Sequence, residues 1–168
     1  MNRIGEPKSM HIKVVTVGRL KEKYWLEAAA EYLKRLTPYA KVEIVEVAEE
    51  RISENPSEAE IRRVKEKEGE RIMKCLSPSF FMIPLVIDGT MMSSEEFSRF
   101  TQRLALEGKS SLAFIIGGSH GLAPEIIKLG DFLLSFSPMT FPHQLMRVLL
   151  LEQIYRGFSI SNGGKYHK

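Results

Sequence analysis

The sequence has little of what marks membrane, disulfide-rich or disordered proteins. Only one of its 168 residues is a cysteine, Cys75, so no internal disulfide can form. Its strongly apolar stretches, such as FFMIPLVI and LLLEQI, are far shorter than the roughly 20 residues that cross a bilayer. No tract is of low complexity, and 43% hydrophobic residues suit a chain that buries its own core. We expect a globular protein with no membrane partner.

Further absences concern location, metal and charge. The first ten residues, MNRIGEPKSM, contain no apolar core of the kind found in signal peptides. We therefore expect a mobile leader over residues 1–9, a single domain over residues 10–168 and a cytoplasmic location. Neither His120 nor His143 has a second ligand at metal spacing, which predicts no metal. The formal net charge of +3 permits a nucleic-acid partner but does not identify one.

Strand and helix patterns alternate along the chain. The strand patterns are valine-rich or continuously apolar runs, and the helix patterns repeat their apolar residues every three or four positions. The expected strands are HIKVVTVG, VEIVEVA, FFMIPLVIDG, SLAFIIGG and DFLLSFS, each followed by a helix pattern. This order predicts an α/β fold with a largely parallel sheet and helices on both faces. Ligands of such sheets bind beyond the carboxyl ends of the strands, here the loops after Asp88, Ile116 and Phe136.

Two of these segments have unusual patterns. Pro84 removes one hydrogen-bond donor from the third strand, which indicates an edge, a bulge or an irregular end. The last helix, PHQLMRVLLLEQIYRGF, is apolar almost all round, so it must be covered on more than one side. In a domain of this size we expect a partner subunit to supply part of that cover.

The loop FIIGGSHGL, residues 114–122, is the first candidate site. Its glycines are out of register for a phosphate-binding P-loop and for a dinucleotide-binding fingerprint. It does match the Gly-x-Ser-x-Gly pattern of serine hydrolases around Ser119, with Asp131 and either His143 or His167 as nominal partners. The glycines also suit a tight turn with positive φ angles, or a backbone that closely approaches a flat organic ligand such as adenine. The residues by themselves leave these three interpretations open.

The stretch LSFSPMTFPHQLMRVLLLEQIYRGF, residues 134–158, is a candidate for the second wall of such a ligand pocket. Its Ser-Pro-Met-Thr-Phe-Pro segment combines apolar and hydroxyl groups, as in pockets with a few directional hydrogen bonds. Together with GGSHGL, the terminal YHK, and the earlier VGRLKEKYW and VKEKEGERI, it resembles the RlmH (YbeA) family of SPOUT-class ribosomal RNA methyltransferases. The resemblance covers nearly the whole chain apart from the leader.

The resemblance implies a SPOUT-type fold whose C-terminal part is threaded into a trefoil knot, in a homodimer. It implies methyl transfer from S-adenosylmethionine to N3 of a pseudouridine in helix 69 of 23S ribosomal RNA. A chain this short has little room for a separate RNA-binding domain, so we expect its partner to be ribosomal RNA within the assembled ribosome. The cofactor-binding residues that the resemblance implies are Leu85, Gly117, Phe136, Ser137, Pro138, Met139, Thr140 and Phe141.

The chemistry of this reaction limits which residue types can be catalytic. Methyl transfer needs an in-line nucleophile, and loss of the N3 proton is helped by a base or by a cation beside the uracil anion. The candidates are Arg156 on the last helix and Tyr166 and His167 in the tail, with Lys168 as a substrate-binding residue. Arg156 is also spaced to form an ordinary i,i+4 salt bridge with Glu152. Whether the tail acts in its own subunit or in the partner subunit is left open by the sequence.

Two hypotheses from other classes compete with a methyltransferase. One is a serine hydrolase that uses the GGSHG loop, and the other is an RNA-binding module without catalytic activity. S-adenosylmethionine binding separates the methyltransferase from both, and a fluorophosphonate probe at Ser119 tests the hydrolase directly.

Overall fold

Strands and helices alternate along residues 9–168, which are the residues that the computed structural model describes. The expected leader therefore lies almost entirely outside the described residues. The strands are β1 (Met10–Val17), β2 (Ala40–Val47), β3 (Phe81–Met91), β4 (Ser111–Ile116) and β5 (Leu134–Ser135). The helices are α1 (Lys23–Leu36), α2 (Glu58–Met73), α3 (Ser94–Leu106), α4 (Pro124–Lys128) and α5 (His143–Ser161). The predicted order of elements is confirmed, although β5 is much shorter than the DFLLSFS segment expected for it.

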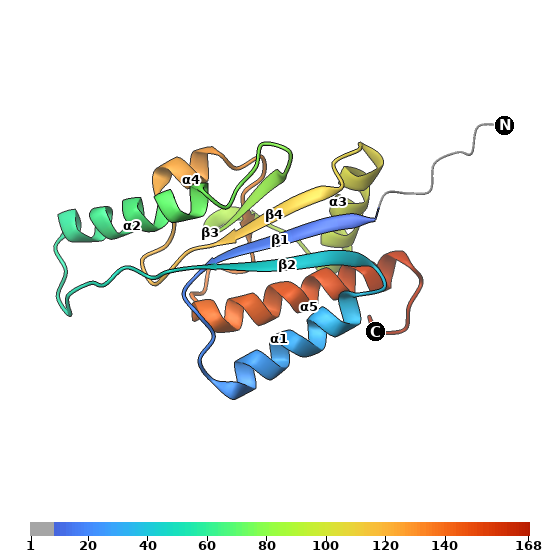
Figure 1. Cartoon of the computed structure of the whole chain (residues 1–168). Helices are drawn as coiled ribbons and strands as arrows, with labels where there is room; N and C mark the ends of the chain where they lie inside the picture. Colours follow the sequence, from blue (N-terminus) through green and yellow to red (C-terminus); the bar gives the residue numbers. More distant parts are fainter. Residues whose placement is uncertain (1–8) are drawn as a thin grey trace.

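The strands form a parallel sheet in the order β2-β1-β4-β3-β5. Figure 1 shows β1 and β4 at its centre. Because every strand runs in the same direction, all their carboxyl ends lie at one edge of the sheet. The α/β class with a largely parallel sheet is thereby confirmed, and the site is to be sought at that edge.

Pro84 marks the point where β3 changes partner. The strand pairs with β4 only over Phe81 to Pro84, and then pairs with β5 through Leu85 and, after a register shift, through Thr90 and Met91. A proline cannot donate to the ladder, so the regular pairing ends where it stands. Of the alternatives raised by Pro84, an edge strand is excluded because β3 lies between β4 and β5, and the register shift that follows is a bulge or an irregularity.

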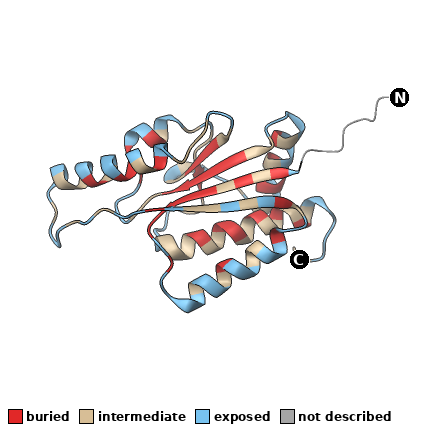
Figure 2. Ribbon diagram, viewed as in Figure 1, coloured by how far each residue is buried: buried red, intermediate tan, exposed pale blue. Residues whose placement is uncertain are grey.

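Helices cover both faces of the sheet (Figures 1 and 2). The side chains of β1 alternate: Ile12 and Val14 pack in a core with α1, α3 and α5, whereas Val15 and Val17 pack in a second core with α2 and α4. This period of two is what a strand buried on both sides requires. The two cores fix the sheet between its helices, which gives the carboxyl edge a rigid base.

Helix α5 is buried on one side and half-covered on the other. Leu150 and Leu151 are fully buried against the sheet, while Leu145, Val148 and Leu149 are only partly covered. The expectation that this helix needs a further cover is consistent with this arrangement, and the C-terminal knot stays a prediction. In the described part of the chain, no helix combines the length and the apolar character needed to cross a membrane.

Candidate active site

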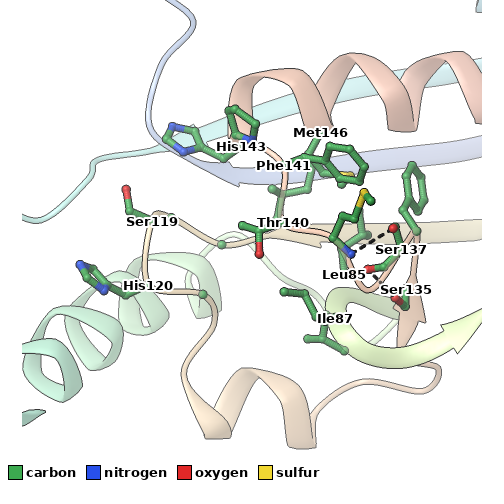
Figure 3. Close-up of a pocket in the computed structure, with 18 of the residues that line it drawn as sticks. Leu85, Ile87, Ser119, His120, Ser135, Ser137, Thr140, Phe141, His143 and Met146 are labelled. Atoms are coloured by element: carbon green, nitrogen blue, oxygen red, sulfur yellow. Dashed lines mark hydrogen bonds between the residues drawn. The ribbon is translucent and has the colours of Figure 1, made fainter.

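A cavity of about 800 Å³ lies at the carboxyl edge of the sheet. A volume of this size suits a small organic molecule, since such sites measure roughly 300–1,000 Å³. Figure 3 shows that side chains from the end of β3, from the glycine loop after β4 and from the loop between β5 and α5 converge on it. The lining comprises residues 85–87, 116–121, 134–137, 139–144 and 146.

The structure brings nearly all the residues predicted to bind the cofactor onto the wall of this cavity. Pro138 is the exception, because it does not line the cavity. Those that do line it are Leu85, Gly117, Phe136, Ser137, Met139, Thr140 and Phe141. Segments that lie far apart in the sequence therefore form the single pocket that the strand-edge rule predicted, and the binding of a cofactor there stays a prediction.

The glycine loop forms one wall through its backbone. The Gly121 amide donates to the Gly118 carbonyl across 3.0 Å, and Gly121 has a φ of +82°, so the tight-turn interpretation is confirmed. A Cβ atom on Gly117 would lie only 2.8 Å from the carbonyl carbon of Gly121. The turn therefore requires glycine at both positions, and it leaves the wall formed by Gly117 free of side-chain atoms.

The opposite wall is a short loop stiffened by its own hydrogen bonds. The Ser135 hydroxyl donates to the Ser137 carbonyl across 3.3 Å, and the Met139 amide donates to the Ser137 hydroxyl across 3.0 Å. Pro138 restricts the same segment without touching the cavity. A loop held in this way is a preorganised wall, which lowers the entropic cost of binding. Met139 is 73% exposed, so its apolar side chain is accessible to a ligand.

A buried carboxyl group supports the glycine loop from behind. Glu68 of α2 is 5% exposed and accepts a hydrogen bond of 3.0 Å from the Glu50 amide. Burial raises the pKa of the Glu68 carboxyl, and the neighbouring Glu49 carboxylate adds to this shift. One Glu68 oxygen would lie 3.1 Å from a Cβ on Gly118, so the second glycine allows the carboxyl group to pack against the loop.

The surroundings of Ser119 do not form a hydrolase triad. Its hydroxyl donates to the Glu49 carboxylate across 3.4 Å, and no histidine of the described chain hydrogen-bonds to it. The Asp131 carboxylate instead accepts the Met82 amide across 2.8 Å. Of the two nominal histidines, His143 lines the same cavity as Ser119 but forms no hydrogen bond with it, and His167 lies beside Glu95. The loop therefore carries the Gly-x-Ser-x-Gly pattern without the base that the chemistry needs.

The catalytic candidates form a second cluster around the end of α5. Arg156 Nε donates to Glu152 Oε1 across 2.9 Å, which forms the expected i,i+4 pair. The Tyr166 hydroxyl donates to the same oxygen across 3.1 Å, and the Arg156 guanidinium lies over the Tyr166 ring at 4.6 Å from its centre. Burial raises the pKa of Tyr166, and the Tyr32 and Glu152 side chains contribute to the shift, so the phenol stays protonated at neutral pH.

The tail residues that follow Tyr166 differ in their contacts. His167 lies between Glu95 of α3 and Arg156 of α5, at 2.7 Å from the first and 3.3 Å from the second. Lys168, the candidate for substrate binding, is exposed. The structure thus brings Arg156, Tyr166 and His167 together and leaves Lys168 at the surface.

The two clusters do not meet within one subunit. His143 lines the cavity at the start of α5, and the stretch from there to Arg156 is about 20 Å long at about 1.5 Å per residue. None of the four candidates from Arg156 to Lys168 lines the cavity. A reaction that uses both clusters must therefore combine them from two subunits or move the tail.

Sequence reasoning missed several residues of both clusters. Ile87 and Met146 line the cavity, and the strand-edge rule pointed to their segments without identifying the side chains. Glu95 contacts the tail, but the pattern SSEE indicates only the start of a helix. The Tyr32 hydroxyl lies 3.4 Å from the Tyr166 hydroxyl. Because Tyr32 lies on the apolar face of a helix pattern, the sequence indicates only that its side chain packs in the core.

Comparisons with known proteins are consistent with this geometry. A family model described as "Predicted SPOUT methyltransferase" matches residues 10–167. The protein named Ribosomal RNA large subunit methyltransferase H from Clostridium kluyveri is 52% identical over 159 residues, which are 95% of this chain and 100% of that protein. The protein of the same name from Bacillus cereus is 55% identical with the same coverage. A probable methyltransferase from Bordetella pertussis has the same fold, with a TM-score of 0.54 over 87% of this chain and 95% of that chain at 14% identity.

Proposed function

The chain belongs to the SPOUT methyltransferase family, in the group of the ribosomal RNA large subunit methyltransferases H, and from this membership we propose that it methylates large-subunit ribosomal RNA. The observation that carries the proposal is the cavity at the carboxyl edge of the sheet, which gathers the residues expected to bind S-adenosylmethionine. In finer detail, we propose that the acceptor is N3 of a pseudouridine in helix 69.

The pocket suits S-adenosylmethionine in size and in chemistry. Its apolar side chains, among them Leu85, Ile87 and Met146, suit the faces of an adenine ring, and exposed backbone groups suit the ring edge. Gly117 and Gly121 keep the glycine loop in its tight turn, so that a wall without side chains at Gly117 faces the ligand. S-adenosylmethionine supplies an electrophilic methyl group, and the chain's part is to hold it and to exclude water.

The tail cluster, formed by Arg156, Tyr166 and His167, suits the binding of the base that accepts the methyl group. Pseudouridine N3 is protonated and becomes a good nucleophile when the uracil ring carries negative charge. Arg156 presents a permanent positive charge that stabilises such an anion, and Tyr166 stays protonated and is a hydrogen-bond donor. We assign Arg156, Tyr166 and His167 to this role and Lys168 to contact with the RNA backbone.

A homodimer supplies the geometry that one subunit lacks. The half-covered residues Leu145, Val148 and Leu149 form an apolar strip along α5 that a second copy of α5 can cover. If the two helices run in opposite directions, the tail of one subunit lies beside the pocket of the other. We therefore propose that each active site combines the pocket of one subunit with the tail of its partner.

Methyl transfer to defined RNA substrates tests this function. Radiolabelled S-adenosylmethionine is incubated with the protein and with whole ribosomes, isolated large subunits or naked 23S RNA. We expect incorporation into ribosomes, because the small dimer recognises an assembled surface rather than a short sequence. Equal methylation of ribosomes and naked RNA would contradict recognition of the ribosome, and no incorporation into any of them would contradict the function itself.

A further inference from the structure

His167 is held from both sides of its imidazole ring. Its Nε2 atom lies 2.7 Å from Glu95 Oε1, and its Nδ1 atom lies 3.3 Å from an Nη1 atom of Arg156. A guanidinium has only donors, so the Nδ1 atom facing it must present a lone pair. The ring proton therefore sits on Nε2 and is donated to the Glu95 carboxylate. The two partners together select one of the two neutral tautomers of His167.

Glu95 belongs to a helix that is well anchored to the rest of the fold, whereas His167, which it contacts, lies in the C-terminal tail. It lies in the first turn of α3, which begins with a capping box between Ser93 and Glu96. The Ser94 hydroxyl donates to the Gln153 side chain across 2.7 Å and so joins the start of α3 to α5. The pKa of Glu95 is lowered to about 2, first by its own backbone amide and next by His167, so the carboxylate is ionised at neutral pH.

The position of His167 in turn restricts the orientation of the Arg156 guanidinium. One edge of that group is bound to Glu152 through Nε, and Nη1 faces His167. Contacts at both ends of a planar fork prevent it from rotating about its last side-chain bond. Arg156 has five N–H donors and these contacts leave some of them free for an RNA base.

We propose that Glu95 is a positioning residue for methyl transfer, which fixes the tautomer and orientation of His167 and, through His167, the guanidinium of Arg156. This inference rests on the proposed function of the tail. Glu95 acts within the subunit that contributes the tail, since all three residues belong to one chain. It touches neither the cofactor pocket nor, directly, the reacting base.

Two variants of Glu95 and one of its neighbour test this role. Glu95→Ala removes the acceptor for Nε2–H, Glu95→Gln keeps an acceptor oxygen without the charge, and Glu96→Gln changes the adjacent carboxyl group while preserving the cap. The Glu95 side chain is 49% exposed, so its replacement leaves the core intact. For Glu95→Ala we expect kcat on ribosomes to fall about tenfold, as for loss of a hydrogen bond to a charged group. The KM for S-adenosylmethionine should not change, because Glu95 lies outside the pocket.

The conservative variant and a direct measurement of the tautomer complete the experiment. Glu95→Gln should restore most of the lost kcat, and Glu96→Gln should behave like the wild type. Nitrogen-15 NMR of the His167 ring should show the proton on Nε2 in the wild type and a mixture of tautomers in Glu95→Ala. An active wild type with a fully active Glu95→Ala, or with an unchanged tautomer in that variant, would overturn this inference alone. A wild type that methylates no RNA would instead contradict the proposed function.

Discussion

Arg147 of α5 donates from Nη1 to Glu46 Oε2 of β2 across 2.7 Å, with only 2% of its side chain exposed. The same guanidinium donates to the Gly18 carbonyl across 3.1 Å, and the same Glu46 oxygen accepts the Leu20 amide across 3.2 Å. These bonds join the start of α5, which lines the pocket, to the ends of β1 and β2. These hydrogen bonds thus hold α5, which carries the catalytic candidates, against the edge of the sheet where the pocket lies.

Replacing Arg147 should destabilise the protein strongly. In Arg147→Met the buried Thr16 hydroxyl and the Gly18 carbonyl lose a hydrogen-bond donor, so we expect the free energy of unfolding to fall by about 2 kcal/mol. Urea denaturation measures this. The matched control is Arg103→Met, whose exposed pair with Glu107 should contribute less than about 1 kcal/mol. Equal losses in the two variants would show that the bonds of the buried Arg147 do not hold α5 to the sheet as described above.

Adding one methyl group to the glycine loop should abolish cofactor binding. The Cβ of Gly117→Ala would lie 2.8 Å from the Gly121 carbonyl carbon, so the turn must open and the pocket wall must move. We expect isothermal titration to detect no binding of S-adenosylmethionine at concentrations that saturate the wild type. Ser119→Ala in the same loop is the control and should bind and methylate normally. Ester hydrolysis by the wild type that is lost in Ser119→Ala would revive the serine-hydrolase hypothesis.

Removing the tail should separate catalysis from cofactor binding. Deletion of Tyr166 to Lys168 takes away His167 and the aromatic support of Arg156, while the pocket lies at the other end of α5. We expect a strong loss of methylation with normal S-adenosylmethionine affinity and an intact dimer by light scattering. Tyr166→Phe keeps the ring beneath Arg156 and should lose less activity than the deletion. Full activity of the truncated protein would exclude the tail from the reaction.

Mixed dimers distinguish a shared site from a site within one subunit. Gly117→Ala subunits have a damaged pocket and Arg156→Ala subunits a damaged tail cluster, so each homodimer should be inactive. If a site combines the pocket of one subunit with the tail of the other, each mixed dimer has one intact site. Co-expression in equal amounts should then restore about a quarter of the wild-type activity, since half of the dimers are mixed. Sites contained within single subunits predict no recovery.

The buried carboxyl of Glu68 should make stability depend on pH. Its pKa is raised above the ordinary value of 4.5, chiefly by burial, so the folded state binds this proton more tightly than the unfolded chain. Stability from this group is therefore complete below pH 4.5 and decreases as the pH rises through the raised pKa. Glu68→Gln keeps an acceptor for the Glu50 amide and should raise Tm more at pH 8 than at pH 4.5. Glu66→Gln, at an exposed position of the same helix, should change Tm equally little at both values.

The location of the pocket could be predicted from the sequence because it follows local rules, whereas the residues expected to bind the cofactor came from the family resemblance. An apolar run that ends in Gly117 and Gly118, and another that runs into Pro138, identify strand ends, and parallel strands bring such ends to one edge. Local rules also account for two helix starts: Ser57 and Ser93 precede α2 and α3, and each side chain accepts the backbone amide three residues further along the chain.

The contacts among the catalytic candidates could not be predicted in the same way. His167 and Glu95 are 72 positions apart, and Tyr166 and Tyr32 are 134 positions apart. Neither contact follows from a helical or strand period, because both depend on how the tail folds back over α5. The sequence also does not show that the tail packs at the far end of α5, away from the pocket, which is the reason for proposing a shared site.

Nucleoside mass spectrometry of 23S ribosomal RNA tests the central claim most directly. The RNA is taken from a strain that lacks this protein and from the same strain supplied with it, and the helix 69 fragment is isolated before digestion. We predict N3-methylpseudouridine in the complemented strain and unmodified pseudouridine at the same position in the deletion strain. The same methylated nucleoside in both strains, or in neither, would contradict the assigned reaction.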